Sequence, residues 1–204
     1  DYVDDKLLEE LATADLEYLA VQLLRMLTGE AIAGGFPVVV AELTREMSSE
    51  ANFAELSSQF KAGVLARRLH DMGHRCTPMP HACCMAGEPE RTGELAKCYR
   101  DGSLHREEAS PKKCSGCVHQ LASSANLENI KALAAESERS LATTGLPAAV
   151  RQGHERRVEI LRNVLTAEHR AGRRNVNLFA EAQKAWEATA ARHLERTSGS
   201  SYDK

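Results

Sequence analysis

The sequence predicts a mainly α-helical protein, and three observations support this fold class. The chain has 204 residues, of which 43% are hydrophobic but only 4% aromatic, and Ala and Leu dominate its apolar side chains. This composition favours helices packed through Ala and Leu over a β-sandwich, which needs more Val, Ile, Tyr and Phe. Apolar residues also recur at helical spacing on both sides of one aperiodic region, residues 74–122, which holds all six cysteines.

Two helices are expected before residue 50. The first spans residues 4–28, where Leu recurs at helical spacing, with Asp15 available to cap a second segment and Gly29 ending the helix. The second begins at Pro37, which suits a first helical turn, and reaches about residue 47. The triplet Val38–Val40 would also suit a short strand, but helix is the favoured interpretation.

A third, amphipathic helix is expected over residues 51–70, ended by Gly73. Lys61, Arg67 and Arg68 lie away from its apolar side, so these three side chains are expected to face solvent. The apolar stripe consists of Phe53, Leu56, Phe60, Val64, Leu65 and Leu69.

The C-terminal part is expected to form an antiparallel helical hairpin with a trailing helix. Ser123 or Ser124 would cap a helix over 124–142, and Gly145 with Pro147 marks a stop and restart before a helix over 147–170. A break over 172–177 precedes a trailing helix over 178–195. The chain is therefore divided into a helical segment (1–73), an irregular metal-stabilised knot (74–122), the hairpin with its trailing helix (123–196) and a disordered tail (197–204).

The cysteines of residues 74–122, the cysteine-rich region, have the spacing of a metal site. From Cys84 the pattern reads C-x13-C-x15-C-x2-C, so Cys114 and Cys117 lie two residues apart on a tight turn. A nearly fifty-residue segment without periodicity needs an organiser, and a tetrahedral ion bound by thiolates provides one. The predicted ligands are Cys84, Cys98, Cys114 and Cys117.

Three interpretations of this cysteine cluster remain open. Structural zinc comes first, because zinc prefers thiolates and a closed four-thiolate site leaves no open position for catalysis. An iron–sulfur cluster also uses four thiolates, and inert or redox-active thiols are the third option. The adjacent Cys83 and the spare Cys76 leave the ligand set ambiguous, and an imidazole could replace one thiolate, the candidates being His74, His81 and His119.

Charge is nearly balanced overall, with a formal net charge of −3, but Arg is concentrated after residue 150. This basic helix face could contact phosphate groups, although interleaved Glu155, Glu159 and Glu168 also suit an ordinary exposed helix with ion pairs. The candidate nucleic-acid contacts are Arg151, Arg156, Arg157, Arg162, Arg173 and Arg174.

Other signals narrow the function classes. No apolar run reaches the ~18–20 residues that span a bilayer, and the first residues lack a secretory signal, so a cytoplasmic protein that contacts no membrane is expected. No phosphate-binding loop, nucleophile elbow or HExxH motif is present, and no small-molecule substrate is expected. His154 and Arg157 form an HxxR, which is interpreted as part of a solvated helix face.

Several short stretches together resemble the region that follows the catalytic core in bacterial mobile-element integrases of the tyrosine recombinase family. The order of a helical segment, a cysteine-bearing knot and a helical hairpin is similar over residues 10–170. The matching stretches are Glu17–Ala20, Leu27–Gly35, Cys83–Cys84, Ala96–Tyr99 and Pro111–Cys117. The catalytic Arg, Lys, His and Tyr set of that family has no counterpart here, so the core either has been removed or was never present.

The resemblance implies DNA recombination or integration, with this chain as a non-catalytic part that binds DNA, a recombinase core or other protein subunits. It is not expected to be an enzyme. The alternative is a thiol-based redox or metal sensor that controls a protein partner, for which the spare thiols Cys76 and Cys83 would supply a bridging pair.

Overall fold

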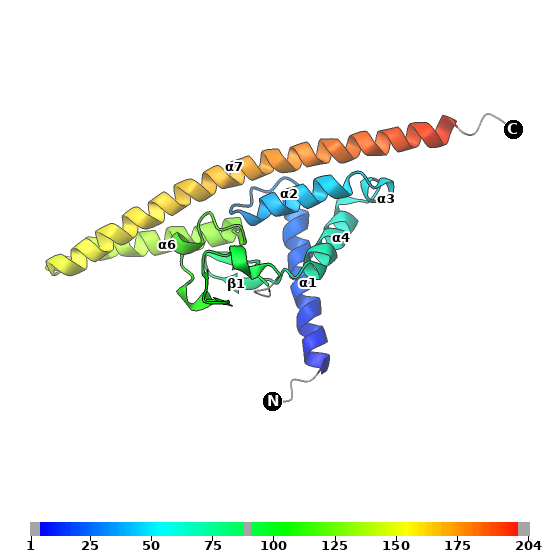
Figure 1. Cartoon of the computed structure of the whole chain (residues 1–204). Coiled ribbons are helices and arrows are strands. Elements are labelled where there is room, and N and C mark those ends of the chain that lie inside the picture. Colours follow the sequence, from blue (N-terminus) through cyan, green and yellow to red (C-terminus); the bar gives the residue numbers. More distant parts are fainter. Residues whose placement is uncertain (1–4, 88–90, 200–204) are drawn as a thin grey trace.

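The computed structural model describes residues 5–87 and 91–199, and it confirms the mainly α-helical fold class. Long helices flank a small irregular region that contains short antiparallel strands (Figure 1). The longer helices are α1 (Asp5–Leu27), α2 (Phe36–Met47), α4 (Ser58–Asp71), α6 (Ser124–Leu141) and α7 (Ala148–Gly199).

The first two helices begin and end close to where the sequence predicts. α1 ends at Leu27, and Gly29 follows with φ of +91°, a left-handed conformation that glycine adopts without steric cost. α2 begins at Phe36 with Pro37 in its first turn, so Val38–Val40 is helical and not a strand. Asp15 lies inside α1 and caps no second segment. Its carboxylate instead accepts a hydrogen bond from the Cys76 backbone amide at 3.2 Å.

The helix predicted over residues 51–70 is two helices, α3 (Ala51–Ala54) and α4. The Ser57 hydroxyl caps α4 by accepting a hydrogen bond from the Phe60 amide, which starts a new helix at that point. The predicted apolar stripe is wrong at Phe60 and Val64, which are 68% and 39% exposed.

Lys61, predicted to face solvent, is 4% exposed. Its ammonium group donates to the Ala54 carbonyl at 2.9 Å and lies 4.1 Å from the ring centroid of Trp186 on α7. The position of Lys61 is therefore set by a helix more than one hundred residues away, which the local periodicity of α4 could not indicate.

The cysteine-rich region contains two small antiparallel sheets. Strands β1 (Thr77–Met79), β2 (Ala82–Cys84) and β5 (Gln120–Leu121) form one sheet in the order β1-β2-β5, and β3 (Tyr99–Arg100) pairs with β4 (Ser103–Leu104). Three single-turn helices complete the region: η1 (Gly93–Leu95), η2 (Arg106–Glu108) and α5 (Pro111–Cys114).

The predicted hairpin forms between α6 and the first part of α7, which pack along each other. Ser123 caps α6, and the Asn126 side chain accepts a hydrogen bond from the Ser123 backbone amide at 3.0 Å to complete a capping box. Gly145 adopts a φ of +79° in the connecting turn. The hairpin core includes Leu127, Ile130, Ala134, Leu161 and Val164.

The break predicted over 172–177 is absent, because α7 continues as one helix of 52 residues to Gly199. Gly172 is buried where α7 approaches Ala31, so this glycine provides room for close packing and does not end the helix. The same continuity extends α7 into the tail predicted to be disordered, whose last residues, 200–204, lie outside the described residues.

The distal part of α7 packs on the N-terminal helices and not on the hairpin. Phe179 and Trp186 are both 6% exposed and belong to the core formed mainly by α1, α2 and α4. α7 therefore joins the two helical blocks, and the cysteine-rich region lies beside it (Figure 1). Over the described part of the chain, no helix is long and apolar enough to cross a bilayer.

Candidate metal centre

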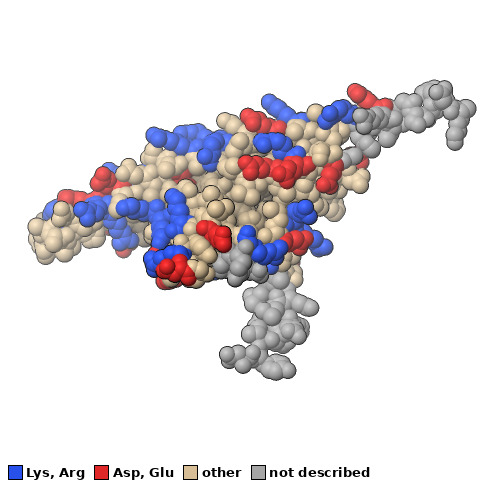
Figure 2. All heavy atoms as spheres, in the orientation of Figure 1, with Lys and Arg blue, Asp and Glu red and all other residues tan. Residues whose placement is uncertain are grey.

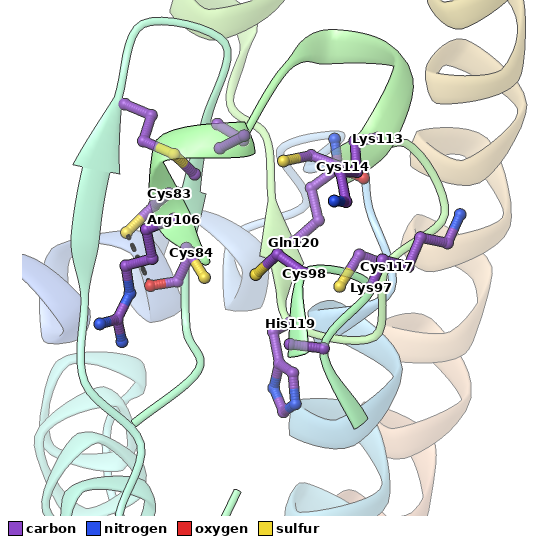
Figure 3. Close-up of a pocket in the computed structure, with 14 residues that line it drawn as sticks. Cys83, Cys84, Lys97, Cys98, Arg106, Lys113, Cys114, Cys117, His119 and Gln120 are labelled. Carbon is purple, nitrogen blue, oxygen red and sulfur yellow. Dashed lines mark hydrogen bonds between the residues drawn. The ribbon is translucent and has the colours of Figure 1, made fainter. Parts of the chain in front are cut away.

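Four free cysteines from separate segments line one small cavity, which the disulfide-bonded Cys83 also borders. Cys84 ends β2, Cys98 follows η1, Cys114 ends α5 and Cys117 follows the next turn. Their side chains enter the same space from separate segments (Figure 3). The cavity volume is about 20 Å³, which is close to the space of a single water molecule and therefore of a single ion.

The turn that carries Cys114 and Cys117 is built by local hydrogen bonds. Ser110 caps α5 by accepting from the Lys113 amide, and Pro111 occupies the first turn, where it loses no helical hydrogen bond. Gly116 then adopts a φ of +69°, which lets the Cys117 amide donate to the Cys114 carbonyl at 2.8 Å. This tight turn places both thiols of the C-x-x-C at the cavity.

The thiols of this cluster influence one another electrostatically. Burial, followed by the charges of Cys84, Cys117 and Cys98, raises the pKa of Cys114 to about 11. Burial, followed by the charges of Cys84 and Cys117, also raises the pKa of Cys98. Negative charge is therefore unfavourable here without a cation, and a bound metal ion would reverse that preference and hold the thiolates.

Of the three candidate histidines, His81 contacts a thiol of this cluster, and His119 is among the residues that line the same cavity. The Nε2 of His81 is 3.3 Å from the Cys114 sulfur, and burial lowers the pKa of His81. His74 instead hydrogen-bonds the Met85 carbonyl through Nδ1, and the His119 ring extends away from the four sulfurs toward His74, with ring centroids 5.9 Å apart (Figure 3).

The remaining two cysteines, Cys76 and Cys83, form a disulfide. Successive residues of a strand face opposite sides of the sheet, so β2 directs the neighbouring Cys83 and Cys84 differently. Cys84 faces the cavity as a free thiol, while the sulfur of Cys83 is bonded to Cys76. In this arrangement Cys84, and not the disulfide-bonded Cys83, offers a free thiol to the cavity.

Within the described residues, the potential ligand atoms of His105, Glu107 and Glu108 all lie within 4.8 Å of one another, whereas the thiols of Cys84, Cys98, Cys114 and Cys117 are not drawn together as closely. Glu108 already pairs with Arg100 and Lys113, and the hydrogen bond from Lys113 is the main cause that lowers its pKa. Glu107 accepts a hydrogen bond from His105 Nδ1 at 2.9 Å. Since these carboxylates have protein partners, we interpret the group as an ion-pair network that anchors the segment before α5.

The six arginines predicted to contact nucleic acid are all exposed on α7, but they do not share one surface. Arg162 pairs with Glu138 of α6 at 2.9 Å, and Arg151 reaches the Leu141 carbonyl at 3.5 Å. Arg156 and Arg174 line hollows between α7 and the cysteine-rich region. Four basic residues absent from the predicted set line the same or adjoining hollows: Lys97, Lys112, Lys113 and Arg170.

Sequence reasoning missed these lysines because they are not part of a charged run. Lys97 precedes Cys98, and Lys112 and Lys113 precede Cys114, so their only sequence signal is proximity to candidate ligands. The chain matches no family model, and it matches neither a curated protein nor a solved structure. The resemblance to recombinases consequently remains a prediction.

Proposed function

We propose that this chain is a non-catalytic accessory domain of a site-specific DNA recombinase or integrase, organised by a structural metal ion and associated with DNA. The observation that carries the proposal is the convergence of Cys84, Cys98, Cys114 and Cys117 on a cavity of about 20 Å³. The recombinase assignment rests on the order of the sequence motifs alone.

Zinc is the metal that best fits this donor set. Four thiolates form the closed tetrahedral site typical of structural zinc, and an iron–sulfur cluster is the alternative with the same ligands. The cavity volume of about 20 Å³ suits one ion better than a larger cluster. When bound, the metal would cross-link β2, α5 and the segment around Cys98, which is a structural and not a catalytic role.

The partners proposed are DNA and the recombinase core or other protein subunits. Exposed arginines on α7 and lysines beside the predicted ligands supply the positive charge that phosphate groups require. A cytoplasmic location is part of the proposal, because a reducing compartment keeps four thiols available for a metal, and Cys76 and Cys83 would then also be thiols there.

Elemental analysis of the purified full chain tests the metal centre. One zinc ion per chain is expected, and replacing Cys114 and Cys117 by Ser should abolish binding, whereas Cys76→Ser with Cys83→Ser should retain it. Brown colour with iron in the protein would identify the cluster instead. A metal-free protein whose circular dichroism melt is unchanged by a strong chelator would contradict a structural metal.

Association with DNA is tested separately by a mobility shift of a short duplex. Binding that weakens steeply between ~50 and ~200 mM salt is expected, since phosphate contacts release counterions. No binding at the lower salt concentration would contradict the DNA part of the proposal and leave a domain that contacts protein only.

A second candidate is a thiol-based redox sensor, and the Cys76–Cys83 disulfide favours it. Cys83 directly precedes the predicted ligand Cys84, so formation of this disulfide could alter the metal site. In that reaction one hydrogen peroxide accepts two electrons and two protons from the two thiols, which yields the disulfide and two water molecules.

Mass spectrometry of the reduced, metal-loaded chain after mild peroxide treatment distinguishes the two candidates. A Cys76–Cys83 disulfide formed together with loss of zinc supports the sensor. The same disulfide with zinc retained, or thiols that do not react, supports the structural site.

A further inference from the structure

We propose that a groove between the cysteine-rich region and α7 is the surface that binds duplex DNA, through its phosphate backbone. This inference rests on the proposed function and assigns it to particular residues. It also divides the arginines of α7 into a set that faces the groove and a set that does not.

The groove consists of three adjoining hollows that share residues. The first, of about 450 Å³, is lined by residues of the cysteine-rich region, including Lys97 and Lys112. Lys112 also lines the second, of about 510 Å³, opposite Arg156 of α7. Ser115 connects the second hollow to the third, of about 830 Å³, which lies between α2, the C-x-x-C turn and α7. We call these three adjoining hollows together the basic groove.

Positive charge lines both sides of the basic groove. Lys97, Lys112 and Lys113 come from the cysteine-rich region, and Arg156, Arg170 and Arg174 come from α7. Figure 2 shows Lys and Arg gathered where the cysteine-rich region lies along α7. The acidic residues that line the groove are fewer: Glu42, Glu159 and Glu168, of which Glu168 is only 1% exposed.

The length of this charged surface fits a linear polyanion. Residues 156 and 174 lie about 27 Å apart along α7 at 1.5 Å per residue. That length corresponds to about eight phosphates of one DNA strand at 3.4 Å each. Cations on two facing walls suit a regular charged rod such as duplex DNA. The hollows meet at the exposed Lys112 and the half-buried Ser115, and both side chains are of the type that contacts phosphate oxygens.

One wall of the groove depends on the metal site and the other does not. Lys97 adjoins Cys98 in sequence and donates to the Ser115 carbonyl at 2.5 Å, while Lys112 lies two residues before Cys114. The positions of these lysines therefore follow the cavity ligands. Arg156, Arg170 and Arg174 lie on a continuous helix whose backbone hydrogen bonds do not involve the cysteines. Metal removal should thus weaken DNA binding without abolishing it.

The test compares three variants of the metal-loaded full chain, using fluorescence anisotropy with a 20-base-pair duplex of arbitrary sequence. Two variants each remove cations from one wall: Arg156→Gln with Arg170→Gln and Arg174→Gln, and Lys97→Gln with Lys112→Gln. The matched control removes three exposed arginines that do not line the groove: Arg151→Gln, Arg157→Gln and Arg173→Gln. Circular dichroism and zinc content confirm that each variant is folded.

Replacing the three groove arginines should reduce the slope of log Kd against log salt by about 2–3, because each phosphate contact contributes about 0.9. Replacing the two lysines should reduce this slope by about 2. The control should change this slope by less than about 1. Equal slopes for control and groove variants would overturn the groove while the proposed DNA association stands. Absence of binding by the unmodified chain would overturn both.

Competition experiments identify the partner. Displacement of the duplex by unrelated duplexes of equal length, at equal concentration, supports recognition of the DNA backbone. Equally effective displacement by poly-glutamate of the same charge would overturn the DNA assignment in favour of an acidic protein partner. Preferential displacement by duplex RNA would overturn it in favour of RNA.

Discussion

The cysteine-rich region and the α6–α7 hairpin lie side by side but are stabilised in different ways. The hairpin buries a continuous apolar seam that includes Leu127, Ile130, Leu161 and Val164. Among its described residues, the cysteine-rich region buries two large apolar side chains, Met85 and Leu121, and its other buried side chains are mostly Ala, Cys and polar groups. The latter include His74, His81, His119 and Gln120.

This difference indicates where each part obtains its stability. Apolar burial contributes roughly 25 cal/mol per Å², so a region with few large apolar side chains needs other cross-links. The rest of the chain supplies some: Ala33 pairs with Ala122, and the Gly35 amide donates to the Cys117 carbonyl at 3.2 Å. We infer that the metal supplies the remainder, whereas the hairpin is stabilised mainly by an apolar core, to which Ala82 and Ala122 of the cysteine-rich region also contribute.

Loss of the metal ligands should have the largest effect and should separate the two regions. Structural zinc contributes on the order of 10 kcal/mol in small modules, so Cys114→Ser with Cys117→Ser should unfold residues 74–122. Hydrogen exchange should show lost protection there and retained protection in α6 and the adjacent part of α7. The double variant Cys76→Ser with Cys83→Ser is the control, and it should keep protection in both regions. Simultaneous loss of protection in the hairpin would show that the two regions are one cooperative unit.

A substitution that creates a cavity in the hairpin core should destabilise the hairpin and leave the metal site intact. Ile130 is fully buried, and Ile130→Ala should cost about 2–5 kcal/mol of unfolding free energy because packing is lost and cannot fully re-form. Urea unfolding followed by circular dichroism measures this change, while the zinc content of the folded variant should stay the same. Val150→Ala, at a side chain 44% exposed on α7, should change stability by less than about 0.5 kcal/mol. Loss of zinc in the Ile130 variant would contradict independent stabilisation.

Most of the helical elements could be predicted from sequence, because their signals are local. Ser123 marks the start of α6, and Pro37 marks the start of α2. The errors arise where distant segments meet. Gly172 is a helix breaker by local rules, but α7 continues through it because that residue packs against Ala31. Lys61 is charged and expected outside, but Trp186 covers it.

The candidate site shows the same division between local and distant information. Cysteine spacing singled out four residues that the structure places in the lining of one cavity, and their role as metal ligands stays a prediction. The contact of His81 with Cys114, and the opposition of Lys112 to Arg156 across a groove, depend on how the region folds against α7. No periodicity within either segment carries that information.

The contact between α2 and the C-x-x-C turn provides a smaller test of how the two regions are coupled. A Cβ at Gly35 would lie 2.5 Å from the Cys117 carbonyl oxygen and 2.8 Å from the Val118 Cα, so one backbone must shift. Gly35→Ala should therefore cost about 1–3 kcal/mol and weaken zinc affinity, measured by chelator competition. Gly63→Ala is the matched control, since its Cβ meets nothing within 4 Å and α4 should gain up to about 1 kcal/mol. Unchanged zinc affinity in Gly35→Ala would mean that the turn does not depend on α2.

The smallest predicted effect concerns pH and again belongs to the cysteine-rich region. Burial lowers the pKa of His74, the nearby Arg75 lowers it further, and the hydrogen bond to the Met85 carbonyl partly opposes them. The His119 ring faces it, with a pKa lowered to about 4. Because the unfolded chain takes up a proton at His74 near pH 6.5 and the folded chain does so only at lower pH, stability is lost as the pH falls below about 6.5. His74→Gln keeps a donor for Met85 but removes this titration. We therefore expect a smaller difference in Tm between pH 7 and pH 5 in His74→Gln than in the unmodified chain, measured at equal zinc content. An equal or larger difference would mean that other groups cause the acid sensitivity.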